Sequence, residues 1–232
     1  AREPQSTRDR LAATLGLDGL GARPWLLWLI ACHDLGKGWP GFQCKWKNLS
    51  GLDSGASPDT TVNHAFVSQV ELFELLRELD WPEELAALVA DGVGCHHGER
   101  ASPRELQRIE DNPFKSTLGK PEWHQARRAI FEDLLAIFAP EAVPTKASLS
   151  GPDFMLLAGL TSFADWIGSN EEDFPFGTPE DCETLHAWFD RRRAENAEKA
   201  LDSIGWTART PLAATQKTFD EVFGFTPRPL QQ

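Results

Sequence analysis

Four of the six histidines stand in three short polar clusters, and these are the residues whose types could do chemistry. The clusters are His33–Asp34, His64 and His96–His97. A further candidate is Asp165, which lies within the apolar stretch LAGLTSFADWIGSN. An unpaired carboxylate there would be costly, so we expect a cation or strong donors beside it. Imidazole and carboxylate are ligands of divalent first-row metals, and the clusters therefore predict a metal site.

The adjacency of histidine and aspartate favours two metal ions over one. Neighbouring residues on a helix point about 100° apart, so His33 and Asp34 need not chelate the same ion. A carboxylate can bridge two ions roughly 3.5–4 Å apart while neighbouring imidazoles bind one each. Such a pair activates water and holds the oxygens of a phosphodiester in line.

Simpler explanations exist for each of these residues. A lone histidine at a helix end is usually a cap or a surface group, and a buried aspartate can cap a neighbouring helix. Cys32 and Cys95 directly precede two clustered histidines, which raises a rival Cys/His zinc site, but the chain has no CxxC pair. Both cysteines are better explained as small buried apolar residues. His124 and His186 lie on charged helices, where we expect them to face solvent without a role.

The elements that must position the clusters are predicted to be helices. Apolar residues recur at spacings of three and four, as in Phe66, Val70, Phe73 and Leu76, which follow a plausible N-cap at Asn63. The run PWLLWLI before His33 predicts a buried helix, and the stretch around Asp165 predicts a central helix that is buried nearly all round. We expect an all-α bundle of about eight or nine helices in a single domain.

Composition narrows the class of protein. The 232 residues can bury a sizeable core. A net charge of −12 counts against a stand-alone DNA-binding protein, but it allows a site where metal ions supply the positive charge. No apolar run is long enough for a membrane span, and no signal peptide is recognisable. Four cysteines without a CxxC pair favour a reduced compartment, so we expect a cytoplasmic monomer with no membrane partner.

Several motifs together resemble a known family. They are HDLGK with the following FQ, His64 in NHAFVS, the HHG of His96 and His97, and the ADWIGSN of Asp165. In order and spacing they resemble the HD nuclease domain of the type I CRISPR-associated helicase–nuclease, over nearly the whole chain. The resemblance implies an all-helical HD-domain fold and a two-metal endonuclease that cleaves single-stranded DNA.

The resemblance also assigns roles, residue by residue. Asp34 would bridge the two ions; His64, His96 and His97 would complete one site, and His33 and Asp165 would serve the other. Asp34 and Lys37 would be the catalytic residues, with Lys37 placed to neutralise phosphate charge. Lys37, Ser169 and Asn170 would contact the substrate. The family pattern has a further histidine upstream of the HD motif, whereas no histidine precedes His33 in this sequence.

The same resemblance concerns the rest of the protein. The ending FTPRPLQQ resembles the segment that opens a helicase, so we expect the nuclease domain over residues 1–215 and a connector with the start of a helicase over 216–232. ATP would serve only the helicase. The expected partners are single-stranded DNA and, through the full-length protein, the Cascade surveillance complex.

Two alternatives to the DNA endonuclease stay open. One is an HD phosphohydrolase of nucleotides or cyclic dinucleotides, and the other is a non-catalytic, metal-stabilised docking module. For any metal centre here, two ions of Mn, Fe, Co or Ni suit imidazole-rich ligands better than Mg does. The segment GKGWPGFQCKWKN could offer aromatic rings and lysines to a single strand, but a helix packing its aromatics on the core is favoured.

Overall fold

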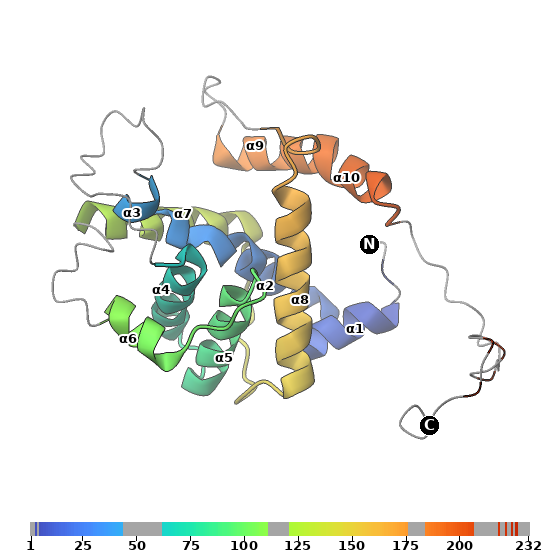
Figure 1. Ribbon diagram of the computed structural model, residues 1–232, viewed down its shortest axis with the longest axis horizontal. Helices are drawn as coiled ribbons and strands as arrows, with labels where there is room; N and C mark the ends of the chain where they lie inside the picture. The colour runs from blue at the N-terminus through green and yellow to red at the C-terminus, as the bar shows by residue number, and fades with distance from the viewer. Residues whose placement is uncertain are drawn as a thin grey trace.

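Helices alone build the described part of the chain (Figure 1). The computed structural model describes Glu3, residues 5–43, 62–110, 121–175 and 184–206, and Thr218, Glu221, Gly224 and Thr226. In chain order the elements are α1 (Gln5–Thr14), α2 (Gly19–Ala31), the 3₁₀ turn η1 (Cys32–Lys37), α3 (Pro40–Gln43), α4 (His64–Glu78), α5 (Glu83–Gly94), α6 (Pro103–Glu110), α7 (Pro121–Phe138), α8 (Gly151–Gly168), α9 (Leu185–Arg192), the π-helical turn η2 (Arg193–Ala197) and α10 (Glu198–Ser203). Over these residues there is no strand, and the all-helical prediction is confirmed.

The core forms around tryptophans of α2. Trp25 and Trp28 are buried, and they meet Trp81 and Phe131 edge to face, with ring centroids 4.9 Å apart in both pairs. Such pairs add about 0.5–1.5 kcal/mol each beyond the burial of their area. The apolar run before His33 is therefore a helix as predicted, but it is buried on one side only, since Leu27 is exposed, and it leads directly into η1.

Helix α4 is buried on more than the one predicted stripe. It begins as expected, because the Asn63 side chain accepts a hydrogen bond from the backbone N–H of Ala65. Leu72 and Leu76 join the main core, while Phe66 packs in a second cluster with Ile109 of α6. Since α4 lies between η1, α5 and α6, it needs apolar residues on several sides.

Helix α8 corrects the prediction of a helix buried nearly all round. Its buried side, which includes Leu157 and Thr161, packs against α1, α2 and α5. Met155 and Trp166, however, are 68% and 76% exposed. Figure 1 shows why: α8 runs along the border of the bundle, with α1 on its far side and α9 and α10 across one end.

Some predictions concern residues outside the described part. Trp39 is 1% exposed, so in GKGWPGFQCKWKN this ring packs in the core, whereas residues 44–48 of the segment lie outside the described ranges. Most of 216–232 also lies outside them, and the domain boundary stays a prediction. None of the described helices is long and apolar enough to cross a membrane.

Candidate metal centre

The HD motif sits in a 3₁₀ turn and not in the α-helix that precedes it. Helix α2 ends at Ala31, and η1 carries His33, Asp34 and Lys37. With three residues per 3₁₀ turn, positions three apart lie on one side. Lys37 Nζ accordingly lies 2.5 Å from Asp34 Oδ2 and pairs with it.

Gly36 lets η1 approach the start of α4. Its backbone N–H donates to Ser68 Oγ at 2.8 Å, and a Cβ placed on Gly36 would lie 1.9 Å from the carbonyl oxygen of His64. Only glycine tolerates this approach without a backbone shift. The result is that Asp34 Oδ1 lies 3.3 Å from His64 Nε2.

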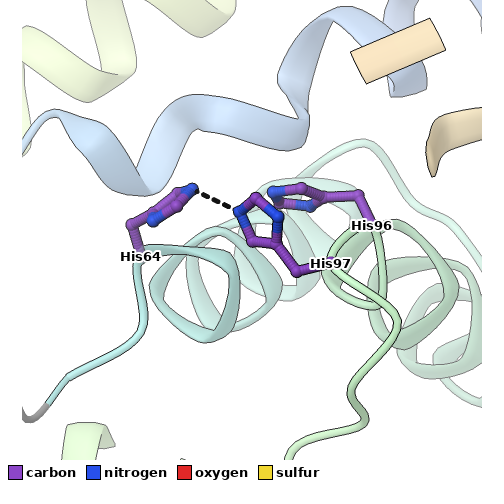
Figure 2. Close-up of side chains that lie close together, drawn as sticks. All are labelled: His64, His96 and His97. Carbon is purple, nitrogen blue, oxygen red and sulfur yellow. Dashed lines mark hydrogen bonds between the residues drawn. The ribbon is translucent and has the colours of Figure 1, made fainter. Parts of the chain in front are cut away.

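The histidine doublet follows the end of α5. A Cβ on Gly94 would lie 2.8 Å from the Cβ of Gln69, so this end of α5 also lies close against α4. The guanidinium of Arg100 binds the Asp91 carboxylate, with Nε to Oδ2 at 2.7 Å, and ties the turn back to its helix. Figure 2 shows the outcome, with His97 Nε2 3.1 Å from His64 Nε2.

Helix α8 supplies the last predicted ligand. Asp165 is buried, and its Oδ1 accepts a hydrogen bond from Ser169 Oγ at 2.9 Å. The same oxygen lies 3.3 Å from His33 Nε2. Residues far apart in the sequence thus meet at one site.

Five of the six predicted ligands form two groups that have one histidine in common. His64, His96 and His97 make one group and His33, His96 and Asp165 the other, with the ligand atoms of each group within 4.8 Å of one another. Asp34 stands between them, because its Oδ1 is 3.9 Å from His96 Nε2 and its Oδ2 is 3.3 Å from His33 Nε2. The sequence had suggested that His96 serves one group, whereas the geometry places it in both. No cysteine joins either group among the described residues, and Cys32 and Cys95 are buried and free.

Buried atoms without hydrogen bonds point into this space. His33 Nε2, His96 Nε2 and Asp34 Oδ1 form no hydrogen bond with any residue that the structure describes. The Nδ1 atoms of the same two histidines instead face the carbonyl oxygens of Ile30, at 2.6 Å, and Val93, at 3.0 Å. A backbone carbonyl on Nδ1 fixes the tautomer in which Nε2 carries a free lone pair. The residues present therefore fit a bound metal.

The protonation states of three predicted ligands agree with this fit, whereas for His33 burial is outweighed by Asp34, which raises its pKa. Burial lowers the pKa of His96 to about 4, and burial together with the neighbouring His64 lowers that of His97. Burial opposes the charge of Asp34, but His33, His64 and Lys37 outweigh it and hold the pKa of this carboxyl well below its usual range. At neutral pH His96 and His97 are neutral and Asp34 is ionised, the forms that metals require.

A buried arginine supports the HD turn and was missed in the sequence. Arg127 is 2% exposed, and its guanidinium donates to the carbonyl oxygen of Gly38 at 2.9 Å and pairs with Glu71 at 2.8 Å. The signal was present, since Trp123, Arg127 and Phe131 follow one another every four residues and place a charge on an apolar face.

The remaining predicted residues differ in whether they contact the metal centre. Ser169 contacts the centre through Asp165, while the side chain of Asn170 bonds Asp173 at 3.0 Å and the N–H of Glu172. His124 and His186 are away from both groups, with side chains 58% and 61% exposed, as expected.

The sequence of this chain matches known proteins. Residues 1–174 match the family model described as Cas3, HD domain. The chain is 31% identical over 235 residues to the CRISPR-associated endonuclease/helicase Cas3 of Thermus thermophilus, covering 98% of this chain and 24% of that protein. The chain thus spans about a quarter of the length of the curated relatives it matches.

Solved structures agree with the sequence relatives. The Thermus thermophilus Cas3 HD domain, crystallised in the presence of Ni²⁺, matches with a TM-score of 0.67 at 29% identity, over 88% of this chain and 77% of that one. A chain from a CRISPR RNA-guided surveillance complex, pre-nicking, shares the fold with a TM-score of 0.70 at 23% identity, over 86% of this chain and 24% of that one. The fold, the histidine groups and the family match lead to one conclusion: this chain belongs to the Cas3 HD-domain family.

Proposed function

We propose that this chain is a metal-dependent endonuclease that cleaves single-stranded DNA in type I CRISPR interference. The observation that carries the proposal is the position of Asp34, whose Oδ1 faces His64 and His96 while its Oδ2 faces His33, which lies beside Asp165. A single-ion site would need only one of the two ligand groups. Membership of the Cas3 HD-domain family supports the same reaction.

The chain's own residues would hold two divalent ions. His64, His96, His97 and Asp34 would bind one ion, and His33, Asp165 and Asp34 the other. Nitrogen-rich ligands suit Mn, Fe, Co or Ni better than Mg, and a relative crystallised with Ni²⁺ supports this choice. When bound, such a pair activates water and stabilises the attacking and leaving oxygens of a phosphodiester.

Lys37 and Asp34 are the proposed catalytic residues. Lys37 is 36% exposed in its side chain and lies at the mouth of the centre, where its ammonium sits 5.8 Å from the ring centroid of Phe42. A substrate phosphate oxygen placed there would meet a positive charge that is already oriented by Asp34. We further propose that Ser169 and Asn170 contact the substrate, with Asn170 exchanging its bond to Asp173 for one to DNA.

The longer relatives suggest the setting of this reaction. They are named as both nuclease and helicase, so we propose that the full-length protein continues into a helicase from the region of residues 216–232 and that ATP serves only that part. A shared fold with a chain of a surveillance complex supports Cascade as the partner that delivers DNA. We expect the full-length protein to act in the cytoplasm.

The test is the nicking of circular single-stranded DNA, which requires an internal cut. With Mn²⁺, Co²⁺ or Ni²⁺ we expect linear products, and with EDTA none. Asp34→Ala should lower the rate by more than the roughly 10–100-fold that follows loss of an outer hydrogen-bond partner of a metal ligand. His186→Ala, which removes an exposed histidine far from the centre, should leave the rate unchanged. Activity that survives EDTA or Asp34→Ala would overturn the mechanism, and faster turnover of a nucleotide panel would favour a phosphohydrolase.

A further inference from the structure

A cavity of about 580 Å³ opens beside the metal centre, between the end of α8 and α9. Gly168 and Phe174 line it on the side of α8, and Trp188, Phe189, Arg192 and Arg193 line it on the side of α9 and η2. Figure 1 shows the segment of α9 and α10 lying across this end of α8. Nothing in the proposed reaction so far uses this cavity.

The cavity lies close to the candidate metal centre along α8. Gly168 lies three residues after Asp165 on α8, which is less than one helical turn of roughly 5.4 Å. The next residue, Ser169, donates its hydroxyl hydrogen bond to Asp165 itself. A DNA strand with one phosphate at the metal centre would therefore reach the cavity with its neighbouring nucleotide.

The lining combines aromatic rings with a positive charge. The guanidinium carbon of Arg192 lies 5.4 Å from the ring centroid of Trp188. Arg193 pairs with Asp190 at 3.2 Å, whereas no described carboxylate lies within ion-pair distance of Arg192. In a chain of net charge −12, this side chain presents a positive charge next to an aromatic surface.

Contacts with α7 and with the segment after α8 hold α9 and η2 in place. Phe189 meets Phe138 of α7 edge to face, with ring centroids 5.2 Å apart. Asn196 Nδ2 donates to the carbonyl oxygen of Asp173 at 2.6 Å, and Arg192 donates to that of Pro175. These contacts connect α9 and η2 to α7 and to the segment that follows α8.

We infer that this cavity holds a nucleotide of single-stranded DNA next to the phosphate at the metal centre. The base would stack on Trp188, and Arg192 would pair with the phosphate that follows it. Aromatic stacking with a basic neighbour is the sequence-tolerant way to hold a single strand, since every base has a face to stack. The inference rests on the proposed function, because it assumes DNA as the substrate.

Binding without cleavage tests the subsite apart from catalysis. We would measure the anisotropy of a fluorescein-labelled oligo(dT) titrated with the chain in EDTA. Trp188→Ala and Arg192→Gln should each raise the Kd on the order of tenfold, and Trp188→Phe should restore most of the binding. Arg191→Gln is the matched control, because it removes the same charge from an exposed neighbour that does not line the cavity.

A small substrate separates this inference from the proposed function. Bis(p-nitrophenyl) phosphate reaches the metal centre but has no nucleotide to fill the cavity, so both cavity variants should hydrolyse it at the wild-type rate with Mn²⁺. Equal Kd values for Arg192→Gln and Arg191→Gln, with Trp188→Ala binding as the wild type does, would overturn the inference. If the wild-type chain hydrolysed neither single-stranded DNA nor bis(p-nitrophenyl) phosphate with any metal, the proposed function would be overturned. The anisotropy measurement would still decide whether the cavity binds single-stranded DNA.

Discussion

His96 lies within reach of both ligand groups, although its one free lone pair can bind only one ion at a time. It is 1% exposed, its Nδ1 faces the carbonyl oxygen of Val93, and its Nε2 belongs to both groups. His97, by contrast, is exposed and belongs to one group only. Two adjacent histidines of identical chemistry therefore have unequal importance.

This inequality gives a prediction at the scale of one residue. His97→Asn should lower the metal content from two ions per chain to one, because only its own group loses a ligand. His96→Asn should also lower it to one ion, and more completely, since the buried imidazole of His96 is oriented by the carbonyl oxygen of Val93 whereas His97 is exposed. Elemental analysis of Mn²⁺-loaded and desalted protein measures this, with His186→Asn as the control. Loss of both ions in either variant would contradict the assignment of His96 and His97 to the same ion.

At the scale of elements, the site depends on how closely η1, α4 and α5 approach one another. Gly36 packs on the backbone of α4, Gly94 packs on Gln69, and Arg127 ties the end of η1 to Glu71. None of these residues is a predicted ligand. They decide whether ligands on separate helices come within a few ångströms of each other.

Gly36→Ala tests this dependence. The new Cβ would meet the carbonyl oxygen of His64 at 1.9 Å, so η1 must move away from α4. We expect a loss of about 1–3 kcal/mol in the free energy of unfolding, together with weaker Mn²⁺ binding, measured by urea unfolding and calorimetry. The matched control is Gly159→Ala on α8, where nothing lies within 4 Å of the added Cβ. That variant should gain about 0.5–1 kcal/mol in helix stability and bind metal unchanged.

At the scale of the whole molecule, Asp153 joins distant parts of the chain. Its side chain is buried at the start of α8, caps that helix with Ser150, pairs with Lys146 at 2.7 Å and binds Arg10 of α1. Burial opposes its charge, but Lys146, Ser150 and Arg10 hold the pKa of this carboxyl well below its usual range. The charged carboxylate thus secures α1 against α8.

The lowered pKa of Asp153 determines in which direction the stability of the fold changes with pH. Because the carboxyl is ionised more readily in the folded state, its contribution is complete above the unfolded pKa of about 3.9 and is lost as the pH falls below that value. Asp153→Asn should lower the free energy of unfolding by about 2 kcal/mol at pH 7, and by progressively less towards a pH of about 2. Urea unfolding across this range measures the difference, and Asp133→Asn, an exposed carboxylate on α7, should show no such trend. A constant cost at every pH would contradict the role of the charge.

The sequence by itself determined the helices, the caps and the six ligand candidates, because period, capping chemistry and residue type are local properties. The N-cap of α4 at Asn63 follows from neighbouring residues alone, whereas the 3₁₀ turn that carries His33 and Asp34 was seen only in the structure. Only the tertiary structure decided that His96 lies within reach of both groups, that α8 exposes Met155 and Trp166, and that a cavity opens between the end of α8 and α9. These facts depend on distances between helices far apart in the chain, and such distances are set by close contacts of side chains and glycine backbones that no local pattern records.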